Sequence, residues 1–256
     1  MTVTQVTERA SFVLAENPGI MTLDGTNTWI LRQGEGRGVV VDPGPPEEEH
    51  LAEVMKAAGG NVALVLFTHR HFDHTESLDR FAEMTGAVCR GTDPQFCRGA
   101  DPLADGERIE VDGLIIDVIA TPGHTTDSTC FLLPDENTLL SGDTILGRGT
   151  TVIAHPDGVL GPYLDSLALI RELIEEGVVQ RILPGHGPVI TDPAPFVDYY
   201  LEHRAERLDQ VRAAVADGAT TAREVVEKVY ADVDPVLWGA AEMSVAAQLE
   251  HLNAGG

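Results

Sequence analysis

The sequence predicts an α/β or α+β domain over residues 1–194 and a small all-helical subdomain over residues 195–256. Apolar runs of strand length alternate with helix-length stretches through the first two-thirds of the chain, which is typical of sheets covered by helices. After the segment Asp-Pro-Ala-Pro at 192–195 the strand patterns stop and only helical patterns remain. At roughly 150 residues per domain, a chain of 256 residues fits one large domain with a small appendage.

The first half of the predicted domain consists of short apolar runs separated by turn residues. A helix is expected over 47–58, because two prolines precede it and two glycines follow it. The continuous apolar run 62–67 has the length of a strand buried on both faces. A further helix is expected over about 77–84. The other predicted strands are 27–31 and 38–41, the second ending at the turn Asp42-Pro43-Gly44.

The second half of the predicted domain contains two strand pairs, an amphipathic helix and a last strand. Asp112-Gly113 between two apolar runs indicates a tight hairpin. The helix, expected over 163–175, presents leucines and isoleucines on one face. The strands are expected over 108–111, 114–119, 129–133, 138–140 and 180–183. Beyond residue 194, helices are expected over about 196–217, 221–230 and 235–252.

The amino-acid composition and charge of the chain disfavour several kinds of partner and location. Lys and Arg number 17 against 41 Asp and Glu, a formal net charge of −24. This charge opposes a nucleic acid or an anionic membrane as the default partner, because both attract basic surfaces. No apolar run approaches the ~18 residues of a membrane span, and no signal-peptide pattern is expected at the N-terminus. We therefore expect a cytoplasmic protein with no membrane partner and with reduced cysteines at Cys89, Cys97 and Cys130.

The most informative segment, Thr68-His69-Arg70-His71-Phe72-Asp73-His74, directly follows the predicted buried strand. Neutral imidazole and carboxylate groups suit zinc and related divalent ions. His69 and His71 are two residues apart and can point the same way from an extended chain, whereas a helix would spread them around its circumference. Asp73 and His74 follow on the turn and can face a second ion. The segment therefore predicts a metal site on a loop at a strand end.

Three later segments share one pattern, in which a strand ends, a small residue follows and one ligand-type side chain comes next. Glycine permits the sharp turn and the close approach of backbone to a metal. Each segment alone is also compatible with an ordinary turn. Together with the first segment they supply five His and two Asp, a set that matches two metal ions bridged by a carboxylate and a hydroxide. The three segments are 121–124 with His124, 141–143 with Asp143 and 184–187 with His186.

With this pattern the chain resembles the metallo-β-lactamase-fold superfamily, whose hallmark is an HxHxDH segment followed by single His, Asp and His ligands. The resemblance covers about residues 10–194. It implies a four-layered αββα sandwich with the metals at one edge between the sheets. We expect two Zn²⁺ per chain, with iron and manganese as competing ions. The ligands that the resemblance implies are His69, His71 and His124 for one ion, Asp73, His74 and His186 for the other, and Asp143 as the bridge.

A closer resemblance rests on the segments Gly25-Thr26-Asn27-Thr28-Trp29, 142–150 and 184–190. They look like the lactamase-beta-2-like subfamily, whose C-terminal region is a winged-helix-like helical subdomain. The three helices predicted after Pro195 are similar to it. Some members of that subfamily cleave single-stranded RNA, and many bacterial members are only called hydrolases. No β-wing is expected here, because no residues remain for a hairpin after the last predicted helix.

Beyond the metal ligands, the sequence offers a few candidates for catalysis and substrate binding. In the implied mechanism a hydroxide between two metal ions attacks the substrate, and Asp73 is the candidate general base. Arg148 is a candidate for binding an anionic substrate group, with a solvated loop arginine as the alternative. Tyr163 is a candidate substrate contact, with packing at a helix start as the alternative. Three other histidines are expected to be solvated: His50, His155 and His203.

Three functions remain open from the sequence. The first is a di-zinc hydrolase of a small ester, thioester, lactone or amide. The second is an endoribonuclease acting on single-stranded RNA, which the residues from 196 onward oppose with 5 Lys and Arg against 11 Asp and Glu. The third is a regulator or scaffold that uses the helical tail for protein contacts. We expect no binding of duplex DNA, and we expect the tail to pack on the core, cover one side of the metal edge and offer a homodimer contact.

Overall fold

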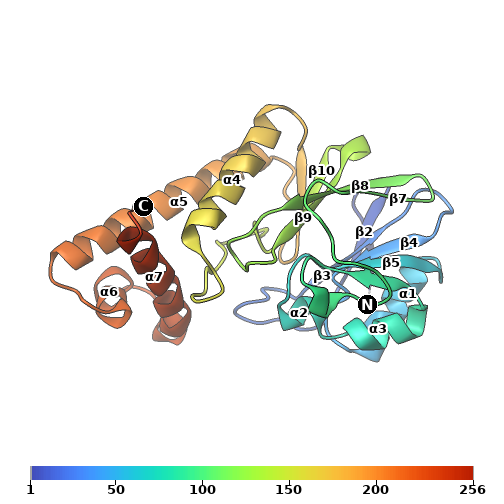
Figure 1. Cartoon of the computed structure of the whole chain (residues 1–256). Coiled ribbons are helices and arrows are strands. Elements are labelled where there is room, and N and C mark those ends of the chain that lie inside the picture. The colour runs from blue at the N-terminus through green and yellow to red at the C-terminus, as the bar shows by residue number, and fades with distance from the viewer. Residues whose placement is uncertain (1, 256) are drawn as a thin grey trace.

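Two β-sheets lie face to face in the computed structural model, which describes residues 2–255, and helices cover the outer face of each sheet (Figure 1). The first sheet has its six strands side by side in chain order: β1 (Val3–Gln5), β2 (Ala10–Leu14), β3 (Asn27–Leu31), β4 (Gly38–Val41), β5 (Val62–Leu66) and β6 (Val88–Arg90). The second sheet runs in the order β11 (Arg181–Pro184), β10 (Thr138–Gly142), β9 (Thr129–Leu133), β8 (Leu114–Ala120) and β7 (Arg108–Val111).

The helices complete a four-layered αββα arrangement. The first sheet is covered by α1 (Glu48–Ala57) and α3 (Leu78–Thr85), and the second by α4 (Leu160–Glu175) and α5 (Pro193–Ala216). The remaining helices are α2 (Phe72–Thr75), α6 (Ala222–Val229) and α7 (Trp238–Asn253), with single 3₁₀ turns at Pro94–Phe96, Pro134–Glu136 and Pro235–Leu237. The layers and the helical C-terminal region confirm the predicted fold class.

Three apolar layers hold the sandwich together. The layer between the sheets includes Trp29 and Phe131, the layer under α1 and α3 includes Leu51 and Phe81, and the layer under α4 includes Leu167. Each of these side chains is at most 2% exposed. Full burial of such a side chain contributes about 1.5–3 kcal/mol, so the layers fix the two sheets against each other.

The carboxyl ends of several strands meet at one edge of the sandwich. Strands β4, β5 and β6 run parallel, and so do β10 and β11. The sheets are joined near this edge, because the Asn27 backbone N–H donates to Gly185 O at 2.8 Å and the Thr129 N–H donates to Thr68 O at 2.8 Å. The indole N–H of Trp29 donates to Pro184 O at 3.0 Å. The loops that leave these strand ends are therefore held at close quarters.

The C-terminal helices extend from one side of the sandwich, as the orange and red ribbons show (Figure 1). The first part of α5 packs with α4 through Val197 and Tyr200, and its last part packs with α6 and α7 through Val211 and Ala214. Since α5 takes part in both cores, the boundary near residue 194 stays a prediction. Within residues 2–255 no strand follows β11, and no helix is both long and apolar enough to cross a membrane.

Candidate metal centre

The segment 68–74 leaves the end of β5 and is held by the carboxylate of Asp42, which follows β4. Asp42 Oδ1 accepts from the Thr68 backbone N–H at 2.8 Å, and Asp42 Oδ2 accepts from the Thr68 hydroxyl at 2.6 Å. The same Oδ2 lies 2.8 Å from His74 Nδ1. Asp42 was not predicted as part of the site, although a carboxylate at the end of a strand beside the histidine segment was the available signal.

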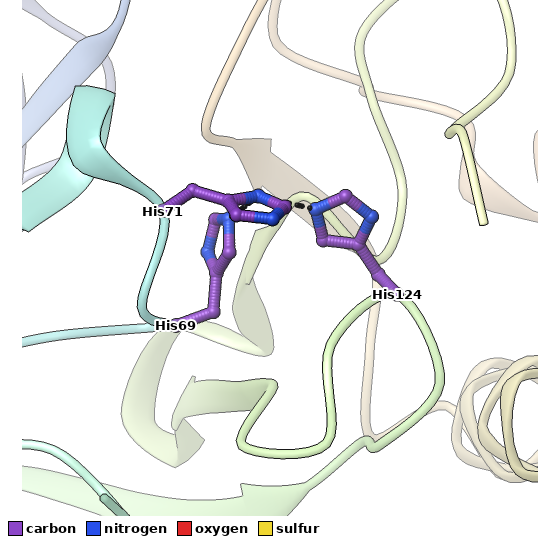
Figure 2. A group of neighbouring side chains, drawn as sticks. All are labelled: His69, His71 and His124. Carbon is purple, nitrogen blue, oxygen red and sulfur yellow. Dashed lines mark hydrogen bonds between the residues drawn. The ribbon is translucent and has the colours of Figure 1, made fainter. Parts of the chain in front are cut away.

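The first ligand group consists of His69, His71 and His124, whose rings converge from two separate loops (Figure 2). His69 Nε2 and His124 Nε2 lie 3.0 and 3.1 Å from His71 Nδ1. The outward nitrogens have their own partners: His69 Nδ1 lies 3.0 Å from the Thr68 hydroxyl and His124 Nδ1 lies 2.8 Å from Val152 O. These partners fix the two rings so that their Nε2 atoms point into the group.

The second ligand group consists of Asp73, His74 and His186. His186 Nε2 lies 3.0 Å from Asp73 Oδ2 and 3.2 Å from His74 Nε2. Each imidazole is again oriented from behind, His74 by Asp42 and His186 by Gly25 O at 3.1 Å from its Nδ1. Both histidines are fully buried, whereas the side chain of Asp73 is 26% exposed.

Asp143, which follows the end of β10, lies between the two groups. Its Oδ1 is 3.5 Å from His74 Nε2, and its Oδ2 is 3.3 Å from His186 Nε2 and 3.9 Å from His124 Nε2. Asp143 Oδ1 is buried and accepts no hydrogen bond. Gly185 makes this packing feasible, since a Cβ at that position would lie 2.6 Å from Asp143 Oδ1. The structure thus brings together all seven ligand residues expected from the sequence.

The histidines of the first group are held in their neutral form. Burial lowers the pKa of His69 well below its ordinary value, and the charge of His74 adds to the effect. Burial, followed by the neighbouring His124, lowers the pKa of His71 to about 4. Burial also lowers the pKa of His124. At neutral pH these rings therefore offer lone pairs toward a common point, which is what a divalent cation needs from imidazole.

The second group is dominated by negative charge. Burial alone would lower the pKa of His74 and of His186, but nearby carboxylates outweigh it. Asp73 and Asp42 raise the pKa of His74 well above its ordinary value, and Asp143 and Asp73 raise that of His186 to about 10. The potential that favours a proton here also favours a metal cation. The partnerless Asp143 Oδ1 and the converging imidazoles therefore fit divalent ions in both groups.

A pocket of about 260 Å³, here called the edge pocket, opens beside His124 and Asp143. Two exposed apolar side chains of the loop between β2 and β3 contribute to it, Ile20 at 60% exposure and Met21 at 52%. Leu237 and Ala240 of the C-terminal region form part of its wall. The helical tail therefore covers one side of the metal edge, as the sequence analysis expects.

The two predicted substrate contacts lie in different environments. Arg148 lines the edge pocket, and its guanidinium is paired with Asp24 at 2.9 Å. Tyr163 is fully buried, and its hydroxyl donates to Thr144 O at 2.8 Å. The interpretation of Tyr163 as a substrate contact is therefore wrong, because its ring packs in the core under α4 and its hydroxyl supports the loop that follows Asp143. Its burial follows from its position at the start of an apolar helix face.

Of the three histidines expected to be solvated, His50 and His203 are more buried than expected, whereas His155 lies at the surface as expected. His50 is fully buried on α1, with its Nε2 2.9 Å from the Thr28 hydroxyl and 3.1 Å from Pro43 O. His203 is half-buried on α5, and its Nδ1 has no hydrogen-bond partner. The side chain of His155 is 37% exposed and lies 2.9 Å from Glu250. None of the three belongs to the two ligand groups.

The αββα sandwich and the histidine–aspartate edge define a metal-dependent hydrolase. The chain belongs to the metallo-beta-lactamase superfamily, because the family model of that description matches residues 21–186. Binding of divalent metal is a property of this family, and the site residues fit it. A second model, the beta-lactamase associated winged helix domain, matches residues 221–256.

Two relatives agree with this assignment, and one solved structure shows the same fold. A beta-lactamase-like protein 2 homolog of Drosophila melanogaster is 34% identical over 98% of this chain and 90% of its own length. An atrochrysone carboxyl ACP thioesterase of Aspergillus chevalieri is 33% identical over 90% of this chain and 76% of its own length. A metallo-beta-lactamase family protein of Thermus thermophilus superposes with a TM-score of 0.81 at 22% identity, covering 98% of this chain and 95% of the other.

Proposed function

We propose that this protein hydrolyses a small acyl substrate, with a thioester as the preferred class, using two zinc ions at the metal edge. His69, His71 and His124 would hold one ion, Asp73, His74 and His186 the other, and Asp143 would bridge them. The observation that carries the proposal is the position of Asp143, whose carboxylate lies within 4 Å of histidines from both ligand groups. A carboxylate shared in this way is what a binuclear site requires.

Bound divalent ions would polarise the substrate carbonyl and lower the pKa of a bound water to ~7. Asp73 is the ligand-group carboxylate within reach of substrate, because its side chain is 26% exposed against 10% for Asp143. Burial raises the pKa of Asp73, but His74 and His186 outweigh this and lower the pKa below its ordinary value. Asp73 is therefore ionised at neutral pH and fit to orient the attacking water and accept its proton.

The edge pocket supports an acyl substrate. Its wall beside His124 and Asp143 is formed largely by apolar side chains, including Ile20, Leu146 and Leu237. Such a wall suits the hydrocarbon part of an acyl group. The water oxygen would form a bond to the acyl carbon, the carbon–sulfur bond would break, and the sulfur would leave as a thiol with one proton. The relative named as a thioesterase favours sulfur as the leaving atom.

The experiment is a metal analysis followed by a turnover panel. Protein purified without chelators should contain about two divalent ions per chain, with zinc more abundant than iron or manganese. The zinc-loaded protein should then be assayed against an acyl thioester, an oxygen ester, a lactone, an amide and single-stranded RNA. We expect the highest kcat/KM for the thioester. Cleavage of RNA without turnover of any acyl substrate would overturn the proposal.

A further inference from the structure

A second pocket, of about 220 Å³, adjoins the edge pocket on the side of the helical tail. It is here called the arginine pocket, because Arg204 and Arg207 of α5 line it together with His203. Tyr230 and Ser244 add two hydroxyl groups, and no Asp or Glu of the described chain is part of its lining. A carboxylate-free pocket with two guanidinium groups is unexpected in a chain with a net charge of −24.

The arginines elsewhere in the molecule are mostly neutralised. Most of them lie within 4.0 Å of a carboxylate. Within residues 2–255 the arginines without such a carboxylate are Arg32, Arg181, Arg204 and Arg207, and the last two line the same pocket. Arg207 stacks on Tyr230, with 4.7 Å from its guanidinium carbon to the ring centroid, and its Nη1 donates to the neutral acceptors Gln210 Oε1 and Val229 O. None of these contacts supplies a negative charge.

Arg204 is a buried cation with unused hydrogen-bonding capacity. The residue is 7% exposed, it donates to Thr151 O, and its guanidinium carbon lies 5.2 Å from the Tyr163 ring centroid. Its Nε is buried and has no hydrogen-bond partner. The Nδ1 of His203 is likewise buried and without a partner. Unsatisfied buried polar groups cost free energy, so these atoms point to a ligand that supplies negative charge and acceptor oxygens.

We propose that the arginine pocket binds a phosphate group that the substrate carries away from the bond to be hydrolysed. Two guanidinium groups match the charge and the several acceptor oxygens of a phosphate monoester better than those of a single carboxylate. Burial and the charges of both arginines lower the pKa of His203 to about 4, so its ring is neutral in the free pocket and offers a further hydrogen-bonding group beside the guanidiniums.

The position of the arginine pocket links it to the metal edge. It shares part of its lining with the edge pocket, including Thr151, Val152 and Leu237. Thr151 also connects the two sites directly, because its hydroxyl donates to Asp143 O at 2.7 Å and its carbonyl accepts from Arg204. One elongated molecule can therefore place an acyl group at the metal edge and a phosphate on α5. This inference rests on the proposed function and narrows its substrate to a thioester whose thiol part ends in a phosphate.

The test uses two probes that differ only in the phosphate, 4′-phosphopantetheine and pantetheine, binding to the zinc-loaded protein in a calorimeter. Because both probes carry the same thiol, any contact with metal is common to them. We expect the phosphorylated probe to bind at least about tenfold more tightly, and Arg207→Gln to remove most of that difference, because it takes away one of the two guanidinium groups. Arg212→Gln is the matched control, since it removes the same charge from the same helix outside the pocket. Arg204 is left intact because it holds Thr151 beside Asp143.

The same pair as S-acetyl thioesters separates binding from chemistry. Arg207→Gln should raise KM for the phosphorylated thioester about tenfold with kcat within twofold, and should leave the unphosphorylated thioester unchanged. Equal affinity for the two probes, or an equal effect of Arg212→Gln, would overturn the phosphate pocket. A phosphate-dependent affinity without turnover of either thioester would overturn the proposed function while supporting the pocket.

Discussion

The two ligand groups at the metal edge differ in how their side chains are prepared for a cation. His69, His71 and His124 form a group of neutral imidazoles, whose pKa values are lowered chiefly by burial. His74 and His186 lie among carboxylates that raise their pKa values despite burial. The first group would therefore attract a cation through the lone pairs of neutral nitrogens, and the second through negative charge, although both contain buried histidines.

This difference also appears in the supports behind the ligands. Behind the first group stand neutral acceptors, such as Val152 O at His124. Behind the second group stands Asp42, a carboxylate that is 1% exposed and contacts His74 directly. Removing charge should consequently weaken the second group selectively, whereas removing the shared carboxylate should affect both.

The largest effect is expected for Asp143→Ala. Because Asp143 lies between the groups, its loss should lower occupancy of both ions and reduce kcat/KM by about 1,000-fold or more. Elemental analysis and turnover of the zinc-loaded variant provide the measurement. The control is Asp79→Ala, an exposed carboxylate on α3. If the variant kept two ions and parental turnover, Asp143 would not be part of the metal site.

The second-largest effect is expected for Asp73→Ala, which distinguishes the two ligand groups. Asp73→Ala should leave about one ion per chain, because Asp73 belongs to the second group alone. We expect a fall in kcat of roughly 100-fold, from the loss of one ion and of the proton acceptor. Metal content measured beside that of His71→Ala checks the assignment. Loss of both ions in Asp73→Ala would show that the two groups are not separable.

A smaller effect is expected for Asp42→Asn, because Asp42 contacts the ligand residue His74 without belonging to either ligand group. Removing its charge should lower affinity for the second ion by about 10–100-fold, as is usual for groups that orient metal-bound histidines. The first ion should lose less affinity, because Asp42 reaches its ligands only through the Thr68 hydroxyl beside His69. Competition with a chromophoric chelator resolves the two affinities. An equal loss at both ions would contradict the charge-based distinction between the groups.

A pH effect of similar size is expected from His50, which lies outside both groups. Burial lowers its pKa to about 4, so the unfolded chain, with a pKa near 6.5, binds the proton more readily. Its contribution to stability is complete above about pH 6.5 and is lost as the pH falls toward 4. Between pH 7 and pH 5 the loss is about 2 kcal/mol.

The measurement for His50 is urea unfolding of the parent and of His50→Asn at both pH values. The asparagine cannot take up the proton, so its free energy of unfolding should fall less than that of the parent between pH 7 and pH 5. Parallel losses in the two proteins would show that His50 does not carry this part of the pH dependence.

The smallest effect is expected for His155→Ala. His155 is partly exposed, pairs with Glu250 and lies outside the ligand groups. Turnover should stay within about threefold of the parent, and both ions should remain bound, because surface ion pairs contribute little. A loss of turnover comparable to that of Asp143→Ala would mean that the wrong histidines have been assigned to the metal site.

Much of the site could be predicted because each ligand follows a strand end. The patterns at 62–67, 138–140 and 180–183 locate three of those ends, and the structure brings Asp73, Asp143 and His186 together there. The layers followed from alternating strand and helix lengths. The strands β1, β2 and β6 were not predicted, since strand formation depends on pairing with neighbouring strands that the local sequence does not specify.

The rest of the site depends on contacts between distant residues, which no local pattern encodes. Asp42 reaches His74 because β4 and β5 run parallel. Tyr163 and His50 are buried because their helices dock on the sheets, although neither residue type requires burial. Residues of α5, of α7 and of the turn that follows α6 line the arginine pocket. The acidic composition of the C-terminal region therefore gives no indication of the charge inside this pocket.

Because the Trp29 indole donates a hydrogen bond to Pro184 O, the fluorescence of Trp29 reports on the segment beside the metal edge. The chain has two tryptophans, and they lie in different regions. Trp29 is 2% exposed between the sheets and is bonded to the segment that carries His186, whereas Trp238 lies in the helical tail under Arg223. Replacing Trp238 by phenylalanine would leave an emission signal from the sandwich alone. Loosening of the metal edge could then be followed by fluorescence separately from unfolding of the tail.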